Sequence, residues 1–311
     1  MVNIKEAQLE FLNWEFGVFF HFGIRTFYEG HKDWDMEPMA LSAFDPRELD
    51  CEEWIRTVWE AGGKYAVLVC KHHDGFANWP SAYTEYSVKN TPWKNGRGDV
   101  VREFVDACHK YDIIPFFYHT LLDWVVESFE NDFPTYLKYL RDSVEILCTN
   151  YGKIGGLWFD GMWSKPDADW EEDALYGVIR KHQPEAMIIN NTGLSHLGEL
   201  GHIELDSVTF ERGKPHPLNM EGAPKYIASE MCQTLNEHWG YTKLDFCYQS
   251  LKNLIEDLCV CRRYGSNLLL NVGPMGNGYI SEIDRAFYGM VGRWVGLFDE
   301  AIRKPRPSGI E

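Results

Sequence analysis

The segment YAVLVCKHHDGF, residues 65–76, decides the fold, because an unbroken apolar run ends in a cluster of polar side chains. Parallel strands that are buried on both faces appear in a sequence as continuous apolar runs of this kind. Seven other stretches have the same character, and the one at 203–210 is the weakest: residues 17–24, 113–120, 156–161, 186–190, 203–210, 226–231 and 267–273. The sequence therefore predicts eight strands.

Amphipathic segments with helical spacing lie between most of these strands. They are residues 52–61, 99–111, 134–149, 167–182, 251–264 and 281–302. Strands that alternate with helices predict an α/β protein, a (β/α)8 TIM-like barrel. We expect a single domain over residues 1–311 with no separate C-terminal domain. The loop at 25–50 is too long for a bare connection, so we expect it to be functional.

The composition argues against several classes of protein. Lys and Arg number 30 against 47 Asp and Glu, so the formal net charge is −17 and no nucleic-acid partner is expected. No run of 18 apolar residues is present, and Lys5, Glu6 and Glu10 stand where a signal peptide is apolar. We therefore expect a cytoplasmic protein that does not associate with membranes. The triplet Asn190-Asn191-Thr192 would accept a glycan only in a secreted protein, so we expect it to be unmodified.

The eight cysteines form no C-x-x-C pair, which disfavours a zinc site built on them. We expect reduced thiols in the core, and neither a metal nor another cofactor.

Polar residues gather at the carboxyl ends of the predicted strands, where the active sites of such barrels lie. A single histidine at a strand end is more often a structural hydrogen-bonding group than a ligand. The number of polar residues at separate strand ends instead favours a site for a polar ligand. They are His21, His72, His73, Asp74, Tyr118, His119, Asp160, Glu211, Glu230 and Asn271.

Carboxylates at two of these places could perform acid–base chemistry. Asp160 ends the run GGLWFD, residues 155–160, where a glycosidase would hold its nucleophile. A glycosidase also needs a second carboxyl group that starts protonated and later activates water. The candidates are Glu204, Asp206, Glu211, Glu221 and Glu230. The sequence alone favours neither Glu211 nor Glu230 over the other.

The neighbouring histidines His72 and His73 would point to opposite faces if the strand continued, so they cannot bind one metal ion as a helical i, i+4 pair does. They could instead hold sugar hydroxyls. Tryptophans in loops and at strand ends also suit a carbohydrate pocket, because sugar rings stack on aromatic faces. These are Trp34, Trp79, Trp124, Trp158, Trp163 and Trp239. A metal-dependent barrel hydrolase and a non-catalytic sugar-binding barrel are the alternatives.

Five motifs together make the sequence similar to glycoside hydrolase family 29, the α-L-fucosidases, from Trp14 to about Ile302. They are FGVFFHFG (16–23), the stretch from Tyr65 through KHHDGF to Trp79, GLWFDG (156–161), WGY (239–241), and NLLLNVGP (267–274) with Gly276 and Gly278.

The resemblance implies that terminal L-fucose is released from fucosylated oligosaccharides or glycoconjugates by a retaining double displacement. It assigns Asp160 as the nucleophile and favours Glu211, within TFER (209–212), as the acid/base. Glu230 is then an alternative acid/base or a support. A different terminal sugar stays open, since fucose and galactose share ring stereochemistry apart from the methyl end.

The resemblance also implies a set of sugar-binding positions, in which Asp33 replaces a glutamate: His21, Asp33, Trp34, His72, His73, Tyr118 and Trp239. We add Trp79 and Trp158 as substrate-binding aromatic residues. Family members usually carry a C-terminal β-sandwich, and this chain resembles the barrel alone. Loops that such a domain would brace could be held by another subunit, in a homo-oligomer.

Overall fold

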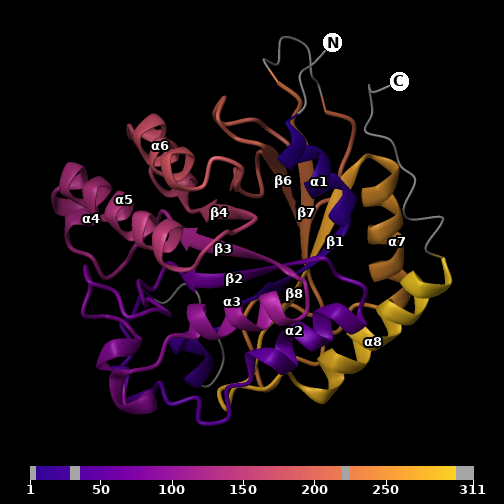
Figure 1. The fold of residues 1–311 in the computed structure, drawn as a ribbon, viewed down its shortest axis with the longest axis horizontal. Helices are drawn as coiled ribbons and strands as arrows, with labels where there is room; N and C mark the ends of the chain where they lie inside the picture. Colours follow the sequence, from indigo (N-terminus) through magenta and orange to yellow (C-terminus); the bar gives the residue numbers. More distant parts are fainter. Residues whose placement is uncertain (1–4, 29–35, 219–224, 299–311) are drawn as a thin grey trace.

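The computed structural model of the chain describes residues 5–28, 36–218 and 225–298. Eight parallel strands form a closed barrel in which each strand pairs with the next and β8 pairs with β1 (Figure 1). The strands are β1 (Phe16–Phe20), β2 (Tyr65–Lys71), β3 (Ile114–Thr120), β4 (Gly156–Asp160), β5 (Met187–Asn190), β6 (Ser207–Glu211), β7 (Ala228–Thr234) and β8 (Ser266–Val272). The predicted (β/α)8 barrel is confirmed.

Helices surround the barrel (Figure 1). They are α1 (Glu6–Trp14), α2 (Cys51–Glu60), α3 (Val100–Lys110), α4 (Ser128–Asn131), α5 (Phe133–Asn150), α6 (Glu172–His182), α7 (Leu251–Arg263) and α8 (Glu282–Leu297). Asp or Ser begins most of the long ones, because these short side chains accept a hydrogen bond from a free backbone N–H of the first turn. The capping residues are Asp50, Asp99, Asp132, Ser250 and Ser281.

Side chains alternate along each strand, and this alternation divides the core into two layers. The barrel interior holds an aromatic-rich cluster that includes Phe19, Tyr65, Phe116, Tyr118 and Trp158. The second layer lies between the strands and the helices. It includes Trp54, Phe104, Leu140 and Ile179 from the helices, packed with Val18, Leu68, Phe117 and Leu157 from the strands.

Helix α1, which the sequence analysis did not predict, closes the amino-terminal end of the barrel. The ring of Phe11 lies 5.6 Å from that of Tyr65 and 6.2 Å from that of Phe116, both near the beginnings of their strands. The amide of Gln8 donates to the backbone oxygens of Asp206 (3.1 Å) and Tyr226 (2.5 Å). The opposite end of the barrel is therefore the open one.

The connection from β5 to β6, residues 191–206, contains no helix, and no helical segment was predicted there. One predicted helix has a different beginning. Helix α6 begins at Glu172 rather than at 167, so residues 161–171 form a longer connection after β4. Both irregular segments lie at the open end. Among the described helices none is long and apolar enough to cross a membrane.

Candidate active site

A cavity of about 1240 Å³ opens at the carboxyl ends of the strands. We call the part lined by the strand-end residues and Trp239 the inner cavity, and the part lined by the connections after β4 and β5 the outer part. Catalytic groups of barrel enzymes come from this end of the strands. Nine predicted residues line the cavity: His21, His72, His73, Tyr118, Trp158, Asp160, Trp163, Glu211 and Trp239.

Alternation along the strands delivers the polar groups of this cavity. Asp160 lies two positions beyond Trp158, and Asn191 lies two positions beyond Ile189. Trp158 and Ile189 both belong to the barrel interior. Since every second residue of a strand faces the same side, the inward face continues into the cavity. The same spacing brings inward His21, Glu211 and Asn271.

The carboxylate of Asp160 is held by four hydrogen-bond donors. Oδ1 accepts from the backbone N–H of Gly161 (2.8 Å), from Nε1 of Trp163 (3.0 Å) and from Nδ2 of Asn191 (3.2 Å). Oδ2 accepts from the hydroxyl of Tyr118 (3.1 Å). The side chain is 15% exposed, so it reaches the cavity while its orientation is fixed.

Asn191 also connects Asp160 to the second carboxyl group. Its Nδ2 donates to Oε2 of Glu211 (2.7 Å) as well as to Asp160 Oδ1 (3.2 Å), and its Oδ1 accepts from the hydroxyl of Thr209 (2.8 Å). Asp160 Oδ1 and Glu211 Oε2 both bind Nδ2 of Asn191. The distance between these two oxygens therefore cannot exceed the two hydrogen-bond lengths taken together, about 5.9 Å. This arrangement brings Asp160 and Glu211 together in one cavity.

Burial raises the pKa of both carboxyl groups, and different neighbours act on each. For Asp160, burial raises the pKa and the donors Trp163, Tyr118, Gly161 and Asn191 oppose the rise by stabilising the charged form. For Glu211, burial raises the pKa first, and the negative charge of Asp160 raises it further. Four donors thus favour the charged form of Asp160, whereas one donor, Asn191, and the charge of Arg212 favour that of Glu211.

Three predicted histidines surround this pair. Nδ1 of His21 donates to Oδ1 of Asn271 (2.6 Å), and Nδ1 of His73 donates to the hydroxyl of Thr120 (2.6 Å), which itself donates to a backbone oxygen. Nε2 of His73 lies 3.6 Å from Asp160 Oδ2. The ring of His72 stacks on that of Tyr118 (5.5 Å between centroids, 8° between planes).

His72 and His73 would point to opposite faces only if the strand continued through them, and it does not. Strand β2 ends at Lys71, and its pairing with β3 shifts between Val69 and Lys71, so strict alternation no longer applies. Both histidines line the cavity, with their ring centroids 4.3 Å apart. Asp74, the next residue, lies outside the cavity and forms an ion pair with Arg25 (3.5 Å).

Aromatic rings form the floor and one wall of the inner cavity. Tyr118 stacks on Trp158 with 5.6 Å between their centroids. Trp239 lies 5.1 Å from His21, and the guanidinium of Arg212 lies 5.2 Å from the Trp239 ring centroid. A pocket of this kind suits the apolar face of a sugar ring.

Glu230 does not reach the cavity. It is the third residue of β7, fully buried, and not at the strand end where the sequence analysis placed it. Its carboxyl accepts from the Tyr65 hydroxyl (2.5 Å) and from Nε1 of Trp158 (2.8 Å). Burial raises its pKa to about 7. The structure thus places Glu230 beneath the aromatic floor, and Glu211 beside Asp160.

Trp79 and Trp124 do not line the cavity. Trp79 is 1% exposed and packs in the layer between strands and helices, and Trp124 is half-buried beside that layer. His119 points outward and bonds the backbone oxygen of Thr120 (2.7 Å) and the hydroxyl of Ser143 (2.9 Å). Asp33 and Trp34, with the rest of 29–35, lie outside the described residues.

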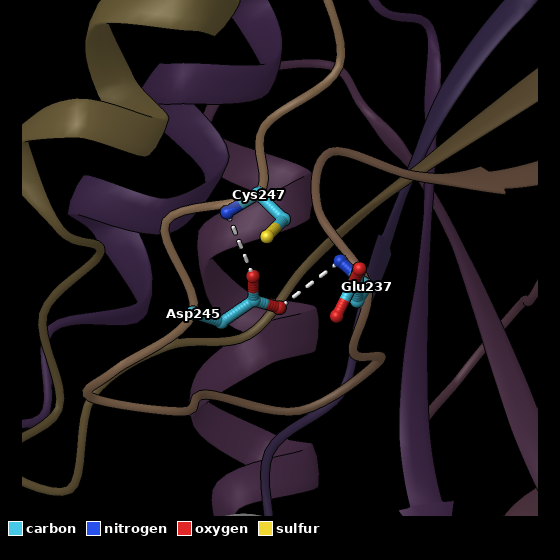
Figure 2. Close-up of side chains that lie close together, drawn as sticks. All are labelled: Glu237, Asp245 and Cys247. Atoms are coloured by element: carbon cyan, nitrogen blue, oxygen red, sulfur yellow. Dashed lines mark hydrogen bonds between the residues drawn. The ribbon is translucent and has the colours of Figure 1, made fainter.

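The connection after β7 carries the only group of three potential metal ligands found among the described residues: Glu237, Asp245 and Cys247. Figure 2 shows that Asp245 lies between the other two and binds their backbone N–H groups, Cys247 through Oδ1 and Glu237 through Oδ2, each at 3.0 Å. Oδ2 also accepts from Nδ1 of His238 (2.6 Å). Asp245 therefore organises the loop that presents Trp239, and its oxygens are already engaged.

Sequence reasoning missed the roles of three residues. Asn191 was considered only as part of a glycosylation triplet, yet it binds both carboxyl groups. Trp163 was expected only as an aromatic residue of a carbohydrate pocket, and Asn271 only as a strand-end residue. Trp163 binds Asp160, and Asn271 orients His21. The two-residue spacing from the strand interior would have indicated Asn191.

The chain is similar in sequence to a known family of proteins. A sequence model of the family described as alpha-L-fucosidase matches residues 2–300. Alpha-L-fucosidase 1 of Arabidopsis thaliana is 34% identical over 187 residues, which are 58% of this chain and 36% of the plant protein. Tissue alpha-L-fucosidase of Homo sapiens is 27% identical over an alignment that covers 96% of this chain and 69% of the human protein.

Solved structures give the same result. Alpha-L-fucosidase isoenzyme 1 from Paenibacillus thiaminolyticus superposes with a TM-score of 0.83 at 28% identity, covering 98% of this chain and 79% of the other. A putative alpha-L-fucosidase from Bacteroides thetaiotaomicron gives 0.81 at 31% identity, covering 94% and 68%. The chain spans little more than a third of the length of the two plant relatives it matches. By the extent of the family match, the chain belongs to the alpha-L-fucosidase family.

Proposed function

We propose that the chain is a retaining exo-α-L-fucosidase that releases terminal L-fucose from fucosylated glycans, with Asp160 as nucleophile and Glu211 as acid/base. One observation carries the proposal: a single amide, that of Asn191, binds both carboxyl groups. Retaining glycosidases hold their two carboxyl groups about 5–5.5 Å apart, and inverting enzymes about 6.5–9.5 Å. An upper limit of about 5.9 Å between two of the oxygens supports retention.

In the first step Asp160 attacks the anomeric carbon while Glu211 protonates the departing glycosidic oxygen. The attack needs Asp160 ionised, and its four donors favour that state. The protonation needs Glu211 neutral, and both burial and the Asp160 charge raise its pKa. The products are a covalent fucosyl ester on Asp160 and the free alcohol.

In the second step Glu211, now ionised, removes a proton from water. The water oxygen attacks the same anomeric carbon, the ester bond to Asp160 breaks, and L-fucose leaves with its original anomeric configuration. Glu211 regains its proton and Asp160 regains its charge. Charge that develops on the sugar ring in each transition state is stabilised by the Asp160 carboxylate.

The inner cavity accounts for sugar binding in this proposal. His21, His72 and His73 supply polar ring atoms for hydroxyl groups, and Trp239 offers an aromatic face for the apolar side of the sugar. Glu230 is not the acid/base here, because it is fully buried beneath Trp158. Cytoplasmic location and assembly into a homo-oligomer stay predictions from the sequence.

The test uses an aryl α-L-fucoside and two variants. We expect Asp160→Gly to lose nearly all turnover and to regain part of it with azide, which fills the place of the missing carboxylate. Glu211→Ala should slow substrates with poor leaving groups far more than substrates with good ones. NMR of the first product should show the α anomer. A first product in the β configuration, or a leaving-group effect for Glu230→Ala and none for Glu211→Ala, contradicts the proposal.

A further inference from the structure

The cavity is larger than a single sugar needs. Its volume of about 1240 Å³ exceeds the range of roughly 300–1000 Å³ typical of pockets that enclose a drug-sized ligand. A deoxyhexose is much smaller than such a ligand, so it occupies only part of this volume. The outer part must therefore accommodate another portion of the substrate or remain filled with water.

Apolar side chains from two separate segments line this outer part. Met162 and Trp163 follow β4, and Leu194 and Leu200 lie in the connection from β5 to β6. We call these four residues the outer wall. Leu194 is 64% exposed, Leu200 38% and Trp163 37%. Apolar groups that are exposed together beside a cavity mark a binding surface more often than scattered ones do.

The backbone of the β5–β6 connection is held in place against this cavity. The Thr192 hydroxyl donates to the backbone oxygen of His196 (2.6 Å), and Gly198 N–H donates to the backbone oxygen of Thr209 (2.9 Å). Gly193 has φ +83°, and a Cβ atom there would lie 3.2 Å from the ring of Trp163. The loop therefore packs directly on the other half of the outer wall.

The same amide that binds the two carboxyl groups also anchors this loop. Gly193 N–H donates to Oδ1 of Asn191 (3.2 Å), whose Nδ2 binds Asp160 and Glu211. The outer wall is thus continuous with the catalytic pair. A group attached to the anomeric oxygen beside Glu211 would leave the inner cavity along it.

Charge around the cavity restricts the group further. Four of its lining residues are carboxylic acids, Asp160, Glu199, Glu211 and Glu237. Arg212 is the single Lys or Arg among the described lining residues, and it lies over Trp239 and donates to the backbone oxygen of Glu237 (2.7 Å). The chain as a whole carries a formal charge of −17. An anionic group would be repelled here.

We propose that the outer wall binds the leaving group of the substrate and selects uncharged leaving groups that present an apolar surface. This inference rests on the proposed fucosidase function. A neutral aglycone with an apolar chain or face gains contact with Leu194, Leu200 and Trp163. A small polar aglycone gains none, and an anionic one meets the acidic lining.

Three fucosides test this selection at nearly constant leaving-group chemistry: methyl, hexyl and 5-carboxypentyl α-L-fucoside. We expect kcat/KM for the hexyl compound to exceed that for the methyl compound at least tenfold, because the chain buries methylene groups. The carboxylate at the end of an equally long chain should remove most of this advantage. The substrate ratio isolates the outer wall, since all three share the fucosyl group.

Variants connect the ratio to the named residues. In Leu194→Ser combined with Leu200→Ser, the hexyl-to-methyl ratio should fall to within about threefold of one. Ile203→Ser is the matched control, because Ile203 is 55% exposed in the same loop and does not line the cavity. It should keep the wild-type ratio.

The outcomes separate the inference from the function. Turnover of all three fucosides with equal kcat/KM, or a ratio that survives the double substitution, overturns the leaving-group assignment and leaves the fucosidase function standing. Absence of turnover for every fucoside, aryl fucosides included, overturns both.

Discussion

At the scale of single residues, Asn191 connects the two carboxyl groups of the site to each other and to the loop that follows β5. It donates to Asp160 and Glu211, accepts from Thr209, and accepts from the N–H of Gly193. A hydrogen bond donated to a carboxylate stabilises the charged form and lowers its pKa. Asn191 therefore lowers both pKa values against the rise that burial causes.

We predict that Asn191→Ala lowers kcat/KM about 100-fold, a loss typical for a donor aimed at charged groups in a buried site. The pKa values of both carboxyl groups should rise. The acidic limb of the pH profile reports ionised Asp160 and the alkaline limb reports protonated Glu211, so the whole bell should move to higher pH. The measurement is kcat/KM for an aryl α-L-fucoside across the pH range.

Asn190→Ala provides the control for this shift. Asn190 is the preceding residue, but its Nδ2 donates to the hydroxyl of Tyr176 (3.1 Å) and to neither carboxyl group. The pH profile of kcat/KM for Asn190→Ala should stay at the wild-type position. A profile for Asn191→Ala that keeps both limbs in place would show that the shared amide does not set the two pKa values.

At the scale of elements, alternation along β7 explains the buried carboxyl group of Glu230. Residues 228, 230 and 232 share one face of the strand, and both Ala228 and Cys232 belong to the barrel interior. Glu230 therefore lies inside the barrel, where desolvation disfavours its charge. Burial raises its pKa to about 7, although Tyr65 and Trp158 donate to it.

This predicts a specific dependence of stability on pH. The pKa of Glu230 in the folded protein lies above its ordinary value of 4.5, so the stabilisation from the neutral carboxyl is complete below pH 4.5 and is lost as pH rises to about 7. Glu230→Gln cannot ionise and avoids this loss. The free energy of unfolding of Glu230→Gln, relative to that of the wild type, should therefore be higher at pH 8 than at pH 5 by on the order of 2–3 kcal/mol.

Urea unfolding of both proteins at the two pH values measures the difference, and the other titrating groups cancel because the two chains share them. Parallel pH dependence of the two proteins would show that Glu230 is ionised in the fold at pH 5 already.

Strand patterns also explain which parts of the site could be predicted. Asp160 and Glu211 end short apolar strands, and a barrel assembles all strand ends at one face, so local pattern and topology suffice to predict them. The choice between Glu211 and Glu230 needed the depth of each residue along its strand. That depth depends on the register between strands. The strand predicted at 203–210 in fact runs from Ser207 to Glu211 as β6.

Other features of the site depend on contacts between distant segments. The shift in pairing that turns both His72 and His73 into the cavity lies between β2 and β3, and nothing in the local sequence marks it. The local sequence does not distinguish Trp79 from an exposed loop tryptophan, because its burial comes from packing in the layer between strands and helices. The β5–β6 connection is a loop that Asn191 and Thr209 anchor.

At the scale of the whole molecule, the two ends of the barrel have separate tasks. The carboxyl end holds the cavity and the irregular connections after β4 and β5. The amino end is closed by α1, and the backbone oxygen of Phe11 accepts from Nδ2 of the buried Asn267 (2.6 Å). The aromatic interior between them separates α1 from the catalytic pair. Stability and activity should therefore respond separately to substitutions at the two ends.

Phe11→Ala tests this separation. Phe11 is fully buried against Tyr65, Phe116 and Trp14, so its loss should leave a cavity and lower the free energy of unfolding by about 3–5 kcal/mol. Leu9 lies on the same helix and is 43% exposed, so Leu9→Ala should change the free energy of unfolding by less than about 0.5 kcal/mol. Both variants should keep the wild-type kcat/KM at 25 °C, measured where the protein is folded. If Phe11→Ala lowers kcat/KM tenfold while the protein remains folded, the closed end of the barrel also controls the geometry of Asp160 and Glu211, because the aromatic interior then transmits the change.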